Sequence, residues 1–187
     1  MAIDVGSTCQ ERASTTNDEW TVIVSENPAN ATGTIDTVCV HSRVGYGMSG
    51  IEYASFADEG SNVLSSNGDT NGSNLSANGQ VTHTAAGDDF VAFAINVDEY
   101  IGVYWAAGRL RATSSGEAGI WGKSGTDWVP ATSQTFSWSA GYTESVYATG
   151  TEAGGGSTTK NTGWETKGEE AGMMFGMTYY GLGIGRG

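Results

Sequence analysis

The sequence predicts an all-β protein: an antiparallel, jelly-roll-like β-sandwich with a Gly-rich C-terminal extension. Short segments that alternate apolar and polar residues follow one another from residue 3 to about residue 150, and Gly, Asn and Asp turns separate them. β-Branched and aromatic residues are frequent in these segments, whereas Lys is rare. No apolar period of 3.6 residues continues over three turns, so we expect no long helix.

The strands are expected at short intervals along the chain. Alternation places Trp20, Val22 and Val24 on one face of a strand, and the run DFVAFAINV is the most apolar segment. Residues 61–79 (SNVLSSNGDTNGSNLSANG) are low in complexity and predict a long polar hairpin or an exposed loop. The predicted strands are residues 3–5, 19–25, 34–41, 49–57, 89–97, 100–106, 109–112, 118–123, 134–139 and 145–149.

The composition changes near residue 150, which predicts a β-sandwich domain over 1–150 and an extension over 151–187. The extension begins with a linker-like stretch, EAGGGSTTKNTG, and ends in AGMMFGMTYYGLGIGRG. Exposed contiguous apolar area usually marks an interaction site, so we expect the extension to be an assembly tail. The residues expected to make its contacts are Met173, Met174, Phe175, Met177, Tyr179, Tyr180, Leu182 and Ile184.

The charge of the chain restricts its partners. The net charge is −13, and residues 1–150 carry 17 acidic and 5 basic residues. Nucleic-acid binding requires a basic face, so this class of partner is not expected, and anionic membrane surfaces are disfavoured for the same reason. No run of about 18 apolar residues exists, so we expect no membrane span.

Two cysteines, Cys9 and Cys39, lie in or near the early strands. A disulfide between them is one alternative, since their number is even. Met1 leads directly into a polar segment, so we expect no signal peptide, and without one two buried thiols are the favoured state.

No cofactor is expected, with Ca²⁺ as the open alternative. Several turns carry carboxylates that could supply oxygen ligands to this ion, although none forms an EF-hand loop. Solvated turn acids are the favoured reading, and Asp69 and Asp88 are the residues we would expect at a Ca²⁺ site.

Aromatic residues are dense for a chain of this length, with 6 Trp and 8 Tyr. In a sandwich most aromatic side chains fill the core, but an exposed ring can stack on a sugar. Trp128 follows Asp127 in a loop-like segment and is the best candidate for an exposed, glycan-binding ring.

Catalytic signatures are missing from the sequence, so we expect a protein that is not an enzyme. No serine stands in a G-x-S-x-G motif, and His41 and His83 lack an evident partner pattern. Paired carboxylates for glycoside hydrolysis remain open, because such a pair requires only proximity in the fold.

Five short phrases occur in a characteristic order along the chain: residues 3–7 (IDVGS), 12–14 (RAS), 27–35 (NPANATGTI), 98–104 (DEYIGVY) and 146–150 (VYATG). This order resembles a β-sandwich module of tailed-bacteriophage structural proteins. The similarity spans about residues 3–150, and the Gly-rich C-terminus departs from the module. It implies a virion component of the decoration, head-fibre or tail-fibre type and supplies no catalytic residues.

These observations lead to two functional hypotheses. The first is a non-enzymatic virion structural protein, a capsid decoration or fibre component, which is made in the host cytoplasm and exposed on the particle. Its partners would be virion proteins or copies of itself, reached through the tail. The alternative is a carbohydrate-binding or host-recognition β-sandwich module whose ligand is a host-surface glycan.

Overall fold

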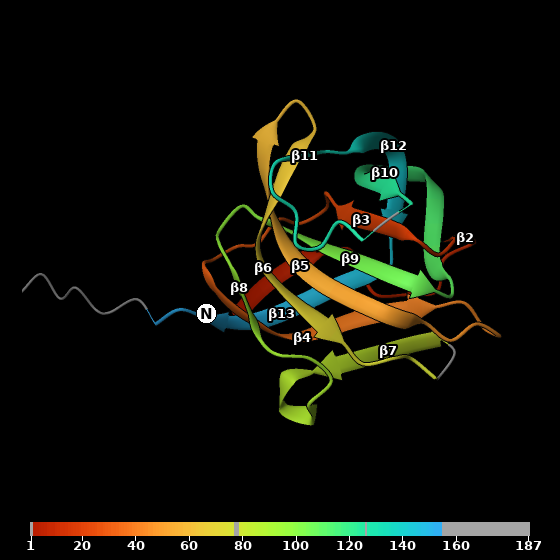
Figure 1. The fold of residues 1–187 in the computed structure, drawn as a ribbon, viewed down its shortest axis with the longest axis horizontal. Helices are drawn as coiled ribbons and strands as arrows, with labels where there is room; N and C mark the ends of the chain where they lie inside the picture. Colours follow the sequence, from red (N-terminus) through yellow and green to blue (C-terminus); the bar gives the residue numbers. More distant parts are fainter. Residues whose placement is uncertain (1, 77–78, 126, 155–187) are drawn as a thin grey trace, which may run out of the picture. The chain divides into compact units, whose positions relative to one another are not determined.

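The computed structural model describes residues 2–76, 79–125 and 127–154, and these residues form an antiparallel all-β structure (Figure 1). The predicted fold class is therefore confirmed. One short helical turn, η1 (Ala85–Gly87), interrupts the strands in this part of the chain. The eight residues expected to form the assembly tail's contacts lie outside the described residues.

The strands form two layers, which we name after their central strands. In the β4 sheet, β13 pairs with β1 on one side and with β4 on the other, and β4 also pairs with β7 and β8. The strands of the β4 sheet are β1 (Ala2–Gly6), β4 (Gly33–Ser42), β7 (Gly79–Thr84), β8 (Phe93–Ile95) and β13 (Val146–Glu152).

The β9 sheet has the order β10-β3-β9-β5-β6-β11, and β2 and β12 pair with β10. A single residue pair, Leu110 with Ser42, joins this layer to the β4 sheet. The strands of the β9 sheet are β2 (Ser14–Thr16), β3 (Trp20–Val24), β5 (Ser49–Gly60), β6 (Val63–Gly72), β9 (Tyr100–Ala107), β10 (Leu110–Ser124), β11 (Gln134–Thr135) and β12 (Ser137–Glu144).

The main core lies between the two sheets. β1 and β13 pack against β9, and β8 packs against β5 and β6. Strand alternation sends Val38 and Val40 inward from the β4 sheet, while Val103 and Trp105 point inward from the β9 sheet, and all four are fully buried. Outward residues of each strand therefore form the two outer faces of the sandwich.

Several strand boundaries differ from the prediction. Residues 63–72 form β6, a partner of β5, although the sequence there is polar; Ser61 and Asn62 both have positive φ, which matches the twist of a tight hairpin turn. The predicted strand 89–97 reduces to β8, because its pairing with β4 covers only three residues. The predicted strands 109–112 and 118–123 belong to one bulged strand, β10.

The expectation of two free thiols is wrong: Cys9 and Cys39 form a disulfide. Cys39 lies on β4, and Cys9 lies in the segment that follows β1, so the bond ties this segment to the β4 sheet. The chain divides into two compact units after Ala153, and the first comprises residues 1–153.

Candidate functional site

The outer face of the β9 sheet carries a second apolar cluster. Ile23, Ala54 and Phe56 point away from the main core and are nonetheless fully buried. The segment 127–136, which lies between β10 and β12 and contains β11, covers them with Val129, Ala131 and Phe136. The ring of Phe136 meets Phe56 edge-on, with the ring centroids 5.9 Å apart. We call residues 127–136 the cover segment.

Hydrogen bonds fix the cover segment to the sheet at several points. The amide of Ser66 donates to the Ala131 carbonyl at 2.8 Å, and the amide of Ala131 donates to Ser66 Oγ at 2.8 Å. The amide of Trp128 donates to Thr21 Oγ1 at 3.2 Å. Together with the pairing of β11 to β6, these contacts give the segment one defined position.

Trp128 is half-buried, whereas the sequence predicted an exposed ring. Its indole packs against the second apolar cluster, and the ammonium of Lys123 lies 3.7 Å from the ring centroid. That ammonium also donates to Gln134 Oε1 at 3.1 Å. One face of the Trp128 ring is therefore engaged by a cation–π contact, and its part in glycan binding stays a prediction.

A carboxylate pair, Glu52 and Asp127, lies beside the cover segment. Glu52 on β5 stands opposite Tyr104 on β9 and is half-buried. Burial raises the pKa of Glu52 to about 7, and the hydrogen bond to Asp127 and the negative charges of Asp127 and Asp69 act in the same direction. Glu52 therefore keeps its proton up to a higher pH than an ordinary glutamate does.

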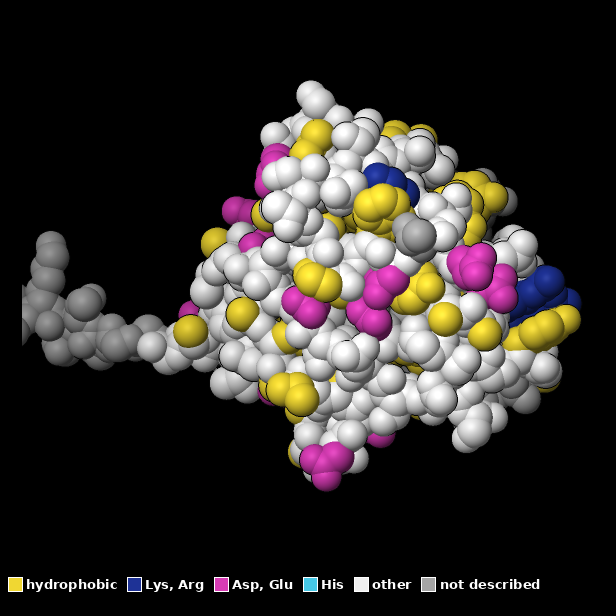
Figure 2. All heavy atoms as spheres, viewed as in Figure 1, with side chains coloured by type: hydrophobic (Ala, Val, Ile, Leu, Met, Phe, Trp, Pro, Cys, Tyr) yellow, Lys and Arg dark blue, Asp and Glu magenta, His cyan; other side chains and the backbone are white. Residues whose placement is uncertain are grey.

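On the face over β5, β6 and β9, Figure 2 shows acidic side chains among hydrophobic ones, with basic side chains in separate places.

The outer face of the β4 sheet has a different surface, a groove of about 530 Å³. Four threonines line it together with the Cys9–Cys39 disulfide, Gln80 and Tyr147. We call it the threonine groove. Its threonines come from the N-terminal segment and from three neighbouring strands and are Thr8, Thr37, Thr82 and Thr149.

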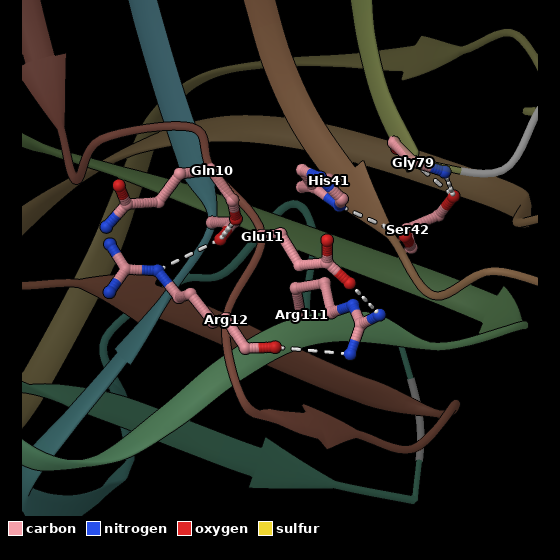
Figure 3. A network of polar contacts seen from close by, with 8 residues as sticks. Gln10, Glu11, Arg12, His41, Ser42, Gly79 and Arg111 are labelled. Carbon is pink, nitrogen blue, oxygen red and sulfur yellow. Dashed lines mark hydrogen bonds and ion pairs between the residues drawn. The ribbon is translucent and has the colours of Figure 1, made fainter.

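The N-terminal segment 7–12 supplies Thr8 and Cys9 to this groove and is held by a polar network (Figure 3). Arg12, with 7% of its surface exposed, donates from Nε to Ser145 Oγ at 2.9 Å and from Nη2 to the Thr8 carbonyl at 3.2 Å. Ser145 Oγ in turn donates to the Gln10 carbonyl at 2.6 Å. The part of the segment that follows Cys9 is thus bonded to Ser145, the residue between β12 and β13.

Arg111 on β10 ties the same segment to the β9 sheet (Figure 3). Its Nη1 donates to the Arg12 carbonyl at 3.1 Å, and its Nη2 forms an ion pair with Glu11 at 2.6 Å. Glu144, which is fully buried at the end of β12, accepts a hydrogen bond from Thr16 Oγ1. Burial raises the pKa of Glu144, although the Thr16 bond and the Arg12 charge oppose the shift.

The two residues considered for Ca²⁺ lie on separate elements. Asp69 is exposed on β6, opposite Ala54, and Asp88 follows η1, where its amide donates to the Ala85 carbonyl. No group of three or more His, Cys, Asp or Glu side chains arranged to hold a metal occurs in the described part of the chain. Within those residues, no helix has the length and apolarity to cross a membrane.

Comparison with known proteins gives no relative for this chain: no family model, curated protein or solved structure matches it. The similarity of residues 3–150 to phage structural modules therefore stays a prediction. The features of this chain that bear on function are its two outer faces and its division after Ala153.

Sequence reasoning did not predict the threonine groove. Its residues come from positions 8–9, 37–39, 80–82 and 147–149, which only the pairing of β4 with β7 and β13 brings together. The one available signal was the outward position of Thr37 and Cys39 in a strand whose other face is apolar.

Proposed function

We propose that the protein is a non-enzymatic structural component of a virion, of the capsid decoration or fibre type. The observation that supports this function best is the division of the chain after Ala153. The first unit is a β-sandwich whose described core is built from its own residues, and the sequence beyond it is apolar and rich in Gly. Such a chain suits a displayed domain with a separate attachment segment.

The charge distribution fits display in many copies. Residues 1–150 carry 17 acidic and 5 basic residues, so neighbouring domains repel one another and remain soluble. Contacts through the tail can be individually weak, because repeated contacts in a symmetric array add to a strong total attachment.

The test compares the full chain with two variants by size-exclusion chromatography with light scattering. One variant ends at Gly154, and the other keeps the full length but carries Phe175→Ser, Tyr179→Ser and Leu182→Ser. We expect an oligomer for the full chain and folded monomers for both variants, with unchanged circular dichroism of the β domain. Oligomers of the same size in all three proteins would overturn the assembly role of the tail.

A second candidate function is recognition of a host-surface glycan by the same β domain. The observation in its favour is the threonine groove, a polar and solvent-facing surface of the β4 sheet. A glycan array probed with the full-length protein tests this candidate. Binding that is lost in Trp128→Ala would place the ligand at the cover segment, and an array without any bound glycan would contradict the candidate.

A further inference from the structure

The floor of the threonine groove is a fixed and regular surface. β4 pairs with β13 on one side and with β7 on the other, so Thr37 stands opposite both Thr149 and Thr84. In the next row, Cys39 stands opposite Tyr147 and Thr82. Neighbouring strands are about 4.8 Å apart, so polar side chains repeat across the floor at this spacing.

One wall of the groove is covalently held. The disulfide joins Cys9 to Cys39 in the floor, and Ser7 donates from its amide to the Val146 carbonyl at 2.9 Å. On the other side of Cys9, Arg12 holds the segment through Ser145 and through the Thr8 carbonyl. A site that is formed before the ligand arrives loses less entropy on binding.

The lining combines uncharged hydrogen-bonding groups with small apolar surfaces. In the described structure, no hydrogen bond engages the side-chain hydroxyls of Thr8, Thr82 and Thr149 or the amide of Gln80. Threonine methyl groups and the disulfide supply apolar area between them. Each threonine hydroxyl can donate and accept, and the Gln80 amide offers both functions as well.

The aromatic residue in the lining is Tyr147, which is half-buried. It lies on β13 between Gly6 on β1 and Cys39 on β4. Burial raises the pKa of the Tyr147 phenol, and the charge of Asp4 and its hydrogen bond to the phenol act in the same direction. The phenol therefore remains neutral.

We propose that the threonine groove binds a neutral oligosaccharide, whose hydroxyl groups pair with Gln80 and the threonines while a sugar face packs on Tyr147. The proposal rests on the second candidate function and assigns it a site other than Trp128. The groove of about 530 Å³ lies within the range of small-molecule sites.

The chemistry of the lining disfavours other ligand classes. Among the described residues, no Lys or Arg lines the groove, and a chain with a net charge of −13 repels anionic ligands. None of the described lining residues carries a carboxylate either, the group on which Ca²⁺ and Mg²⁺ sites depend. An added peptide strand needs a free sheet edge, but β4 is paired on both sides along the floor.

The test measures the binding of neutral trisaccharides (maltotriose, cellotriose and chitotriose) and of one anionic control, sialyllactose, to the full-length protein by calorimetry. We expect binding of at least one neutral sugar and none of the anionic sugar. Tyr147→Ala and Gln80→Ala should each weaken the binding about tenfold, which corresponds to the loss of one ligand contact. Trp138→Ala, an exposed aromatic residue on β12, is the matched control and should leave the affinity unchanged.

The outcomes separate the groove from the candidate function on which it rests. Binding of a neutral sugar that is lost in Trp128→Ala but retained in Tyr147→Ala would overturn the groove and keep glycan recognition. Failure of all three neutral sugars to bind would overturn the proposal for the groove, and a broader array without hits would overturn glycan recognition as well. Circular dichroism verifies that each variant is folded, and Tyr147→Phe should retain most of the affinity because it keeps the ring.

Discussion

The two outer faces of the sandwich differ in polarity and in whether another segment of the chain covers them. Outward residues of the β9 sheet, such as Ile23 and Phe56, are apolar, and the cover segment buries them in a second cluster. Outward residues of the β4 sheet, such as Thr37 and Thr149, are small and polar, and they remain the floor of a groove. The character of alternate residues in each strand thus decides whether a sheet recruits a cover or serves as a surface.

The largest effect is expected where the cover meets the β9 sheet. Phe136 is 2% exposed and packs against Phe56, so Phe136→Ala leaves a cavity under the cover segment. We expect a loss of about 3–5 kcal/mol in the free energy of unfolding, measured by urea denaturation. Val91→Ala, at a side chain that is 77% exposed, should change it by less than about 0.5 kcal/mol. Equal effects of both variants would mean that the second cluster is not a core.

A somewhat smaller effect is expected from the disulfide on the opposite face. Cys9 and Cys39 are 30 residues apart, and their bond restricts the unfolded chain. The double variant Cys9→Ser/Cys39→Ser should lose about 3 kcal/mol of stability. Its amide exchange should increase around Thr8 and Tyr147 but not in the cover segment. If amide exchange in this variant became faster only in the cover segment, the two faces would not be stabilised independently.

The carboxylate pair predicts a pH dependence that belongs to the β9 face. The pKa of Glu52 is raised to about 7 in the folded protein, so the folded state holds a proton that the unfolded state releases near the ordinary value of 4.5. The stabilisation from this proton is complete below pH 4.5 and is lost as the pH rises to about 7. Glu52→Gln should therefore be less sensitive to pH between 4.5 and 7 than the unmodified protein.

Glu144 and His83 also affect how stability depends on pH between 4.5 and 7, so a matched control is necessary. The raised pKa of buried Glu144 acts in the same direction as that of Glu52. Burial lowers the pKa of His83, so its contribution is lost as the pH falls below 6.5. Thermal unfolding curves of Glu52→Gln and of the exposed-site variant Asp18→Asn isolate the Glu52 share. If the stability of the unmodified protein and that of Glu52→Gln depend on pH in the same way, the pKa of Glu52 is not raised in the folded protein.

The smallest effect is expected at the cation–π contact of Trp128. Lys123→Met keeps the length of the side chain but removes the ammonium that lies 3.7 Å from the ring centroid. We expect a loss below about 1 kcal/mol together with a changed Trp fluorescence spectrum. A loss of several kcal/mol would indicate that Lys123, rather than the apolar cluster, holds the cover segment.

The parts of the fold that could be predicted are those with clear apolar alternation. The strands around Val22, Val38 and Val103 were predicted because each sends apolar residues to the main core. β6 was missed as a strand because its sequence is rich in Ser, Asn and Gly, and only its pairing with β5 makes it extended. The prediction of two buried thiols is wrong because the spacing of the cysteines in the sequence does not reveal that Cys9 lies against β4.

The candidate sites were less predictable than the fold. The sequence predicts an exposed Trp128 ring because the neighbouring residues are typical of a loop. The apolar residues that follow it belong to the cover segment, however, and Trp128 is half-buried with them. The threonine groove needs residues from four parts of the chain, and no local pattern indicates that they meet. Sequence patterns thus indicate which faces are apolar but not which segments cover them.

The most direct test of the contrast between the two faces is the relaxation of methyl signals by a soluble gadolinium chelate in NMR spectra of the full-length protein. We expect strong relaxation of the methyl groups of Thr8 and Thr82, which are exposed at the groove. The methyl groups of Val129 and Ala131, which are buried in the cover segment, should be protected. Equal relaxation of the two sets would contradict the account, because it would mean that the β9 face is as open to solvent as the β4 face.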